Sequence, residues 1–392
     1  MNEGIRSYRG NVLLLSIVCI ISNVSYYPIF QASGYGRMTA IAVWIMLLLM
    51  VASRLMKDWT PTLGRYVGLY CVFALNTLIV GAVNGVNAFD NHFFQIITIA
   101  FLIFLISNRF GQEIDIEDLR MICTAYFYSM AIMAVPLFFV YLRGTDLSSP
   151  IYAYTYGKNE IAALLLCAML IASTIYNPQS PIRKLIRIGA IALFIIDILF
   201  LRTRSAMVGI GFWGIVLFIK AKRFRKDVRI LGIASIILIT VYLLTHGSVL
   251  DSFLNNIVYA GRNAYDLNNL SSGRGDQIAL ALETFKENVV FGVGVRRTCD
   301  SFYFSVLANY GLLGWPLIIM SFIPLIWSIK NFSLYDDVSL CFFLVAATFF
   351  ILSLLEELAP FGSGTRCYLL WLMWGILVQN KARNEFREGI AA

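Results

Sequence analysis

Charged side chains are scarce in this sequence. Asp, Glu, Lys and Arg together make up 14% of the 392 residues, whereas 59% of the residues are hydrophobic. A soluble globular domain could not cover its surface with so few charged side chains. The composition therefore excludes a soluble protein and predicts one that crosses a membrane several times.

Histidine is rarer still, and cysteine is present without a pattern. The two histidines, His92 and His246, are too few for a histidine metal centre. The seven cysteines fall mostly inside apolar runs, and their odd number and scattered spacing fit neither a disulfide framework nor a metal cluster. They are Cys19, Cys71, Cys123, Cys167, Cys299, Cys341 and Cys367. We expect no metal and no cofactor.

The formal net charge of +8 could suggest nucleic acid as a partner. Most basic residues, however, lie in short loops between apolar runs, where Lys and Arg orient helices against the cytoplasmic face of a membrane. We therefore expect no nucleic-acid partner. Arg6 and Arg9 precede an apolar run that starts at Asn11 and lacks a small-residue cleavage site. This run is interpreted as a first membrane anchor and not as a removed signal peptide.

Apolar runs near the roughly 20 residues needed to span a bilayer recur along the chain. They lie at 11–30, 38–53, 66–84, 93–108, 119–142, 160–176, 186–201, 204–220, 229–245, 311–329, 339–355 and 367–380. The sequence thus predicts an all-α polytopic membrane protein with about 12 transmembrane helices. It divides into helices 1 to 9 within 1–245, a loop with amphipathic helices at 246–310, and the last helices with a tail within 311–392.

The distribution of basic residues predicts the topology. One set of alternate loops holds most of the Lys and Arg residues, among them the dense run 220–229. Because basic residues near span ends are retained in the cytoplasm, both termini are predicted to be cytoplasmic and the loop 246–300 to face outward.

Several arginines remain on the outer side after topology has been explained. Arg202 and Arg204 lie where one apolar run meets the next without room for a loop, and an arginine at that depth costs a few kcal/mol unless it faces a polar cavity or a partner. The alternative is that both reach the outer headgroups. The outward loop adds Arg262, Arg274, Arg296 and Arg297. Together these cations indicate an anionic, lipid-linked ligand.

Inside this loop, Ile278, Leu282, Phe285 and Val289 follow one another at helical spacing. They predict an amphipathic helix whose apolar side packs on the transmembrane bundle or lies in the interface. Arg274 stands at its start, where free backbone N–H groups also favour an anion. The pair Gly292 and Gly294 that follows is too common a pattern to indicate phosphate binding alone.

The motifs of this region, taken in order, resemble those of the O-antigen ligase and O-antigen polymerase (Wzy-type) superfamily. The resemblance covers about 195–316 together with the layout of spans. It is carried by Thr203-Arg204-Ser205, Gly273-Arg274, the run 287–294, Asp300-Ser301-Phe302-Tyr303-Phe304 and Gly311-Leu312-Leu313-Gly314. The histidine often found at the position of Asp300, and the asparagine expected at Ser301, are absent. Ligases depend on that histidine, so this departure favours a polymerase.

The resemblance implies an activity and a place for it. A polymerase of this family moves a glycan from undecaprenyl diphosphate to the next lipid-linked repeat unit, in the bacterial cytoplasmic (inner) membrane, with its active site facing the periplasm. The expected partners are undecaprenyl-diphosphate-linked oligosaccharides and membrane lipids, with a chain-length regulator and a flippase as further ones. Two alternatives stay open, namely a ligase that transfers the glycan to lipid A–core, and a lipid-linked oligosaccharide flippase or other transporter.

The chemistry needs cations for the leaving diphosphate and a base for the acceptor hydroxyl. Guanidinium groups neutralise a diphosphate without a metal, and a single displacement inverts the anomeric centre. We assign Arg204 and Arg274 to catalysis, with Asp300 as the base and Asp276, Glu356 and Glu357 as reserves. The expected substrate-binding residues are Arg202, Arg262, Arg296, Arg297 and Tyr303. Asp300 could instead cap a helix over 301–309, and Tyr303 could instead be an interfacial tyrosine.

Overall fold

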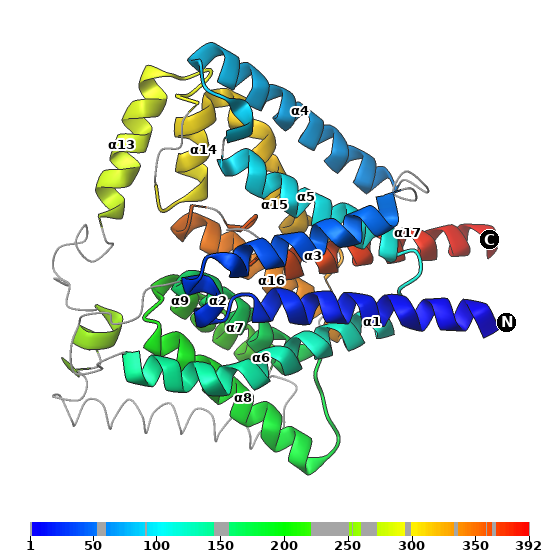
Figure 1. Cartoon of the computed structure of the whole chain (residues 1–392). Coiled ribbons are helices and arrows are strands. Elements are labelled where there is room, and N and C mark those ends of the chain that lie inside the picture. Colours follow the sequence, from blue (N-terminus) through cyan, green and yellow to red (C-terminus); the bar gives the residue numbers. More distant parts are fainter. Residues whose placement is uncertain are drawn as a thin grey trace.

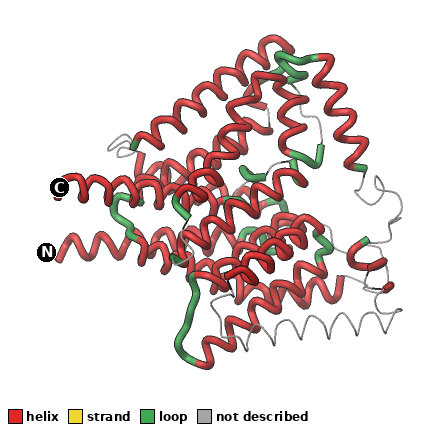
Figure 2. The backbone as a smooth tube through the Cα atoms, turned by 180° about the vertical axis from the view of Figure 1, so that it is seen from behind, coloured by secondary structure: helices red, strands yellow, loops and turns green. Residues whose placement is uncertain are grey.

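The computed structural model describes residues 2–52, 60–90, 92–144, 157–220, 251–252, 254–259, 273–294, 299–332, 336–357, 359–362 and 366–391. These parts of the chain are helices and the turns that join them, with no strand among them (Figure 2). The prediction of an all-helical protein is confirmed for them.

The helices follow the apolar runs. They are α1 (Asn2–Val24), α2 (Pro28–Ala32), α3 (Tyr35–Val51), α4 (Pro61–Asn84), α5 (His92–Phe110), α6 (Ile116–Gly144), α7 (Lys158–Thr174), α8 (Pro181–Phe200), α9 (Arg204–Lys220), α13 (Arg274–Glu287), α14 (Phe302–Tyr310), α15 (Trp315–Lys330), α16 (Asp337–Leu355) and α17 (Tyr368–Ala391). Every predicted span except the first and the ninth overlaps one main helix, and the first, 11–30, is divided between α1 and α2. The ninth, 229–245, lies outside the described residues.

Five of the described helical stretches are long and apolar enough to cross a membrane. They are Pro61–Asn84, Phe93–Phe110, Ile116–Gly144, Phe302–Lys330 and Asp337–Leu355. Shorter apolar helices cover Gly10–Val24, Tyr35–Val51 and Arg204–Val216. A helical protein with several membrane spans is therefore supported, whereas the number of twelve stays a prediction.

Local sequence signals set the ends of the best-defined helix, α4. Thr60 caps its start, because the side-chain oxygen accepts a hydrogen bond from the backbone N–H of Leu63 at 3.1 Å. Pro61 occupies the first helical turn, where its missing N–H is no loss. Gly85 ends the helix in the left-handed conformation, with a φ of 65°.

The two ends of the bundle differ. The beginning of α1 and the end of α17 lie together at one end, and α13 lies at the other (Figure 1). We call these the terminal end and the loop end. Two cytoplasmic termini would require this arrangement, but which end faces the cytoplasm stays a prediction.

Polar groups tie the helices together inside the bundle. The Tyr368 hydroxyl of α17 donates to Asn23 Oδ1 of α1 at 2.7 Å, and the Asn23 side-chain amide donates to Ser129 Oγ of α6, also at 2.7 Å. All three side chains are buried. Such interhelical hydrogen bonds hold helices in register where no water competes for them.

Small residues let α17 pack closely on α5. A Cβ atom at Gly375 would lie 2.7 Å from the backbone nitrogen of Asn108 and 2.8 Å from the carbonyl oxygen of Phe104. Across the same interface, a Cβ at Gly111 would lie 2.9 Å from the Cβ of Gln379. The backbones of the two helices therefore approach as closely as they do only because these positions carry no side chain.

Gly375→Ala is predicted to destabilise the protein by about 1–3 kcal/mol, because the added methyl group meets backbone atoms that cannot move aside. Gly211→Ala in α9 is the matched control, since a Cβ there meets nothing within 4 Å. The free energy of unfolding in mixed micelles would measure both. Equal stability of the two variants would contradict the close packing of α5 and α17.

Candidate functional site

The junction of α8 and α9 places two arginines at the loop end. The chain reverses direction within the three residues between Phe200 and Arg204. Arg202 adopts a φ of 49°, a left-handed conformation that costs a residue with a side chain roughly 1–2 kcal/mol. Its side chain is buried at 1% exposure, while Arg204 is partly buried. The alternative that Arg202 reaches the lipid headgroups is therefore wrong.

Beside this junction lies a buried ion pair that the sequence did not reveal. Arg366, just before α17, contacts Glu356, just after α16, with 2.8 Å between its NH1 and Oε2. Ser205 Oγ, in the first turn of α9, donates to Glu356 Oε1 at 2.5 Å. We call these three residues the Glu356 cluster. The only signal for this ion pair in the sequence is that Glu356 and Arg366, which are of opposite charge, lie in the short segment between two apolar runs.

A second carboxylate helps to keep Arg366 charged. Burial disfavours the guanidinium cation, but the carboxylate of Glu356 and, more weakly, that of Glu160 at the start of α7 outweigh burial. The pKa of Arg366 is accordingly raised above its usual value. Arg366 therefore stays charged inside the protein, so removing Glu356 would leave a buried and uncompensated cation.

Arg274 and Asp300 form a second ion pair. Arg274 is the first residue of α13, and its Nε donates to Asp300 Oδ2 at 3.2 Å. The backbone N–H of Asp300 donates to the side-chain oxygen of Gln277, one turn further along α13, at 2.9 Å. Both contacts fix Asp300 against the start of α13. The Asp300 side chain remains 49% exposed.

Cys299 lies beside the Arg274–Asp300 pair, since it directly precedes Asp300 in the chain. It is buried, and burial raises the pKa of its thiol. The carboxylates of Asp300 and Glu357 raise this pKa further, while Arg274 lowers it. Glu357, which directly follows Glu356 in the chain, therefore acts electrostatically on the turn that holds Asp300.

The predicted amphipathic helix forms, and only part of its expected apolar side packs: Ile278 contacts the bundle, whereas other members of that side do not. α13 starts at Arg274 as expected and ends at Glu287. Its buried residues are Ala281 and Thr284, and Ala281 lies in a small apolar cluster with Cys299 and Ala308. Leu282 and Val289, which were expected on the packed side, are exposed. The short side chain of Ala281 lets α13 come close to α14. A pattern of large apolar residues does not predict this contact, because it is made by a small side chain.

The glycine pair 292 and 294 has a structural reason. A Cβ at Gly292 would lie 2.4 Å from the backbone carbon of Asn309, and one at Gly294 would lie 2.9 Å from the Cβ of Asn84. The N–H groups of Gly292 and Gly294 donate to the carbonyl oxygens of Asn288 and Asn309. These N–H groups are thus used in packing the turn against α14, and they do not form a phosphate cradle.

The remaining predicted residues fall into two groups. Arg262, Arg296 and Arg297 lie outside the described residues. Tyr303 accepts a hydrogen bond from Ser353 Oγ at 3.0 Å, and its ring packs against Phe322 and Phe350, between α14, α15 and α16. The structure does not bring Tyr303 into contact with Asp300. Its role in sugar binding stays a prediction.

The helix cap considered for Asp300 is wrong. α14 starts at Phe302, and its N-cap residue is Ser301, which makes no side-chain capping hydrogen bond. The Asp300 side chain contacts Arg274 instead. This leaves Asp300 free of a structural duty in α14.

A further carboxyl group lies in α8, one turn before Arg202. Asp197 is fully buried, and neither of its carboxyl oxygens has a hydrogen-bond partner in the described part of the chain. An unpaired buried carboxyl group is costly. The sequence signal for it is a single acidic residue in the apolar run 186–201.

Comparison with known protein families and with characterised proteins finds no match to this chain. The resemblance to the O-antigen superfamily therefore rests on the motifs of the sequence. Within the described ranges, no three His, Cys, Asp or Glu side chains come together in a way that could hold a metal ion.

Breaking the buried ion pair is predicted to be strongly destabilising. Glu356→Leu or Arg366→Met alone should cost about 3–5 kcal/mol, because each leaves a buried, unpaired charge, whereas the double variant should recover most of this loss. Glu385→Ala is a control that breaks the exposed pair with Lys381 and should cost less than about 1 kcal/mol. Unfolding in mixed micelles measures all four. Additive losses in the double variant would contradict a direct ion pair.

Asp197→Leu is predicted to stabilise the protein by about 1–3 kcal/mol, because it removes a buried polar group that has no partner. Asp118→Leu is a matched control at the start of α6. Asp118 is also buried, but it accepts a hydrogen bond from the backbone N–H of Asp115 at 3.1 Å, so its loss should destabilise. If both leucine variants unfold at the same temperature, Asp197 has a partner after all.

Proposed function

We propose that this protein is a polysaccharide repeat-unit polymerase that transfers a glycan from undecaprenyl diphosphate to the next lipid-linked repeat unit. The observation that supports it most is the carboxylate of Asp300, which is 49% exposed and lies 3.2 Å from the Arg274 guanidinium at the loop end, the end that also holds Arg204. Polymerisation needs a cation for the departing diphosphate and a reachable carboxylate for the acceptor, and this end of the bundle offers both.

Exposure separates the roles of the two carboxylates. The Glu356 side chain is 7% exposed and is occupied by Arg366 and Ser205, whereas half of the Asp300 side chain is open to an incoming sugar. Asp300 is therefore the base in this proposal. Glu356 is a positioning residue, because it holds the first turn of α9 and with it Arg204.

Geometry separates the roles of the two arginines. In an inverting displacement the base and the leaving group lie on opposite faces of the sugar, which in inverting glycosidases separates the two catalytic carboxyl groups by roughly 6.5–9.5 Å. A guanidinium 3.2 Å from the base cannot also hold the leaving group across the ring. We therefore assign Arg274 to the orientation of Asp300, and the diphosphate to Arg204 at the start of α9.

The reaction then proceeds in one step. Asp300 accepts the proton of the acceptor hydroxyl as its oxygen bonds to the anomeric carbon, and the bond to the diphosphate breaks with its electrons on the phosphate oxygen. Arg204 neutralises the charge that develops there. The loop end would face the periplasm of a bacterial cell with this protein in its cytoplasmic membrane.

Substitutions of these residues should abolish or slow polymer formation. Arg204→Ala is expected to abolish it, and Asp300→Asn, which preserves shape and removes the charge, should slow it by about 10²–10⁴-fold. Arg274→Lys should retain part of the activity that Arg274→Ala loses, since it keeps a cation beside Asp300. Lys286→Ala is the control, because Lys286 is exposed on the same helix. Glycan ladders from cells with equal amounts of each variant would measure this.

The acceptor decides between polymerase and ligase. Purified protein in vesicles would be given a lipid-linked repeat unit together with lipid A–core, and the products separated by length. Longer lipid-linked chains support the proposal. Transfer to lipid A–core would make the protein a ligase, and movement of the lipid-linked substrate across the vesicle membrane without lengthening would make it a transporter.

A further inference from the structure

A pocket opens between α4 and α15 at the opposite, terminal end of the bundle. Its volume is about 230 Å³, and its lining includes Arg65, Tyr66, Ile326, Trp327 and Lys330. Lys330 is the last residue of α15, and the next residue, Asn331, accepts a hydrogen bond from Lys381 of α17. The pocket therefore lies at the end of the bundle opposite to the residues proposed for catalysis.

The charge of this pocket is uncompensated. Arg65 and Lys330 are both exposed, and no carboxylate of the described residues pairs with either of them. Two cations on one small pocket repel each other unless an anion lies between them. The arrangement thus favours a negatively charged ligand.

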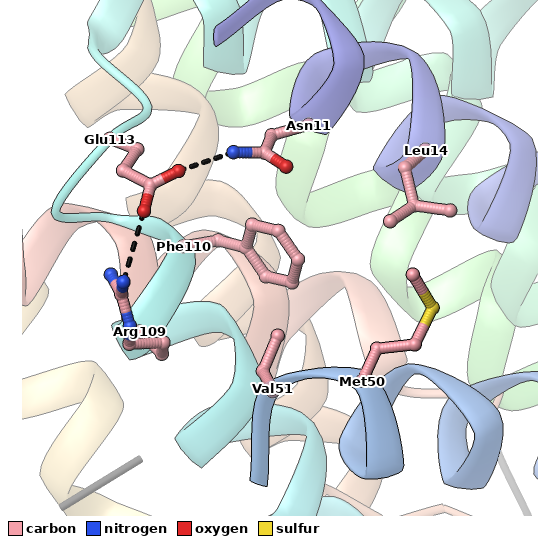
Figure 3. Close-up of a pocket in the computed structure, with 7 residues that line it drawn as sticks. All are labelled: Asn11, Leu14, Met50, Val51, Arg109, Phe110 and Glu113. Carbon is pink, nitrogen blue, oxygen red and sulfur yellow. Dashed lines mark hydrogen bonds and ion pairs between the residues drawn. The ribbon is translucent and has the colours of Figure 1, made fainter. Parts of the chain in front are cut away.

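A nearby pocket shows the compensated case. Between α1, α3 and α5, Arg109 forms an ion pair with Glu113 at 3.0 Å, and the other oxygen of Glu113 accepts a hydrogen bond from Asn11 (Figure 3). A carboxylate of the protein compensates the cation there. No carboxylate of the described residues does so at Arg65 and Lys330.

A buried hydroxyl group also lacks a partner at the uncompensated pocket. Tyr66 is 1% exposed, its ring is packed edge-on against Phe104 and Trp374, and its hydroxyl has no hydrogen-bond partner among the described residues. A buried hydroxyl without an acceptor costs about 1–3 kcal/mol. A ligand oxygen in the pocket that Tyr66 lines would supply this acceptor.

Apart from Thr62 of α4, the rest of the lining is apolar. Ile326 and Ile323 lie one and two turns before Lys330 on α15, and Ile326 is 46% exposed on the outside of the bundle. Trp327 stands between them and Lys330. A polar anionic group at the end of a helix, continued by an exposed aliphatic surface along the same helix, matches the two parts of a phospholipid.

We propose that the pocket between α4 and α15 binds the phosphate of an anionic phospholipid from the leaflet at the terminal end. The phosphate contacts Arg65 and Lys330 and accepts from the Tyr66 hydroxyl, and one acyl chain lies along Ile323 and Ile326. The bound lipid holds the first turn of α4 against the last turn of α15. This proposal does not depend on the enzymatic one.

Native mass spectrometry of the purified protein, titrated with phosphatidylglycerol or phosphatidylcholine in detergent, would test it. The wild type should retain one phosphatidylglycerol that phosphatidylcholine does not replace. Arg65→Ala with Lys330→Ala should weaken this binding about tenfold or more, because it removes two charge-assisted hydrogen bonds. Tyr66→Phe keeps the ring packing but removes one neutral hydrogen bond to the phosphate. It should therefore weaken lipid binding about fivefold or more.

Arg183→Ala with Lys184→Ala is the matched control, since these two exposed cations at the start of α8 line none of the pockets described. This control should leave the binding unchanged. Equal retention of both lipids by the wild type, or equal binding by the double variant at Arg65 and Lys330, would overturn the proposal. So would displacement of the lipid by millimolar inorganic phosphate, which would show a site for the free anion and not for a lipid.

Discussion

The loop end of the bundle depends on one buried charge pair. Glu356 and Arg366 face each other across the turn between α16 and α17, and Ser205 joins them from α9. Both side chains are buried, so each charge is compensated only by its partner. This compensation lasts only while the helices keep the two residues in contact. A pair of this kind contributes little net stability compared with apolar packing, but it penalises every arrangement in which the three segments separate.

The buried pair helps to position the residues of the proposed site. Because Glu356 is fixed, the next residue, Glu357, is held where its carboxylate acts electrostatically on Cys299. Because Ser205 is fixed, Arg204 is held at the start of α9. In the described part of the chain, helices and turns alone place these residues. Asp300 keeps its exposed side toward the solvent, where an acceptor could reach it.

The two ends of the bundle each hold a distinctive pair of charged residues. At the loop end, Glu356 and Arg366 are buried and paired with each other. At the terminal end, Arg65 and Lys330 are exposed around a pocket that no carboxylate of the described chain compensates. Between the two ends, hydrogen bonds such as that of Tyr368 with Asn23, and close contacts such as that at Gly375, keep the helices in register. This middle layer separates the end proposed for catalysis from the end proposed to bind a lipid.

The sequence by itself determined the features that arise locally. Apolar runs of sufficient length set the helices, the absence of a loop set the sharp junction at Arg202, and the residues after Gly273 set the start of α13. The tertiary structure alone decided which groups meet. Ser205 and Glu356 are 151 residues apart, and nothing in their local sequence shows that α9 and α16 are neighbours. The isolation of Asp197 and the packed side of α13 are likewise properties of the helices that surround them, because burial and pairing depend on neighbours and not on the residue itself.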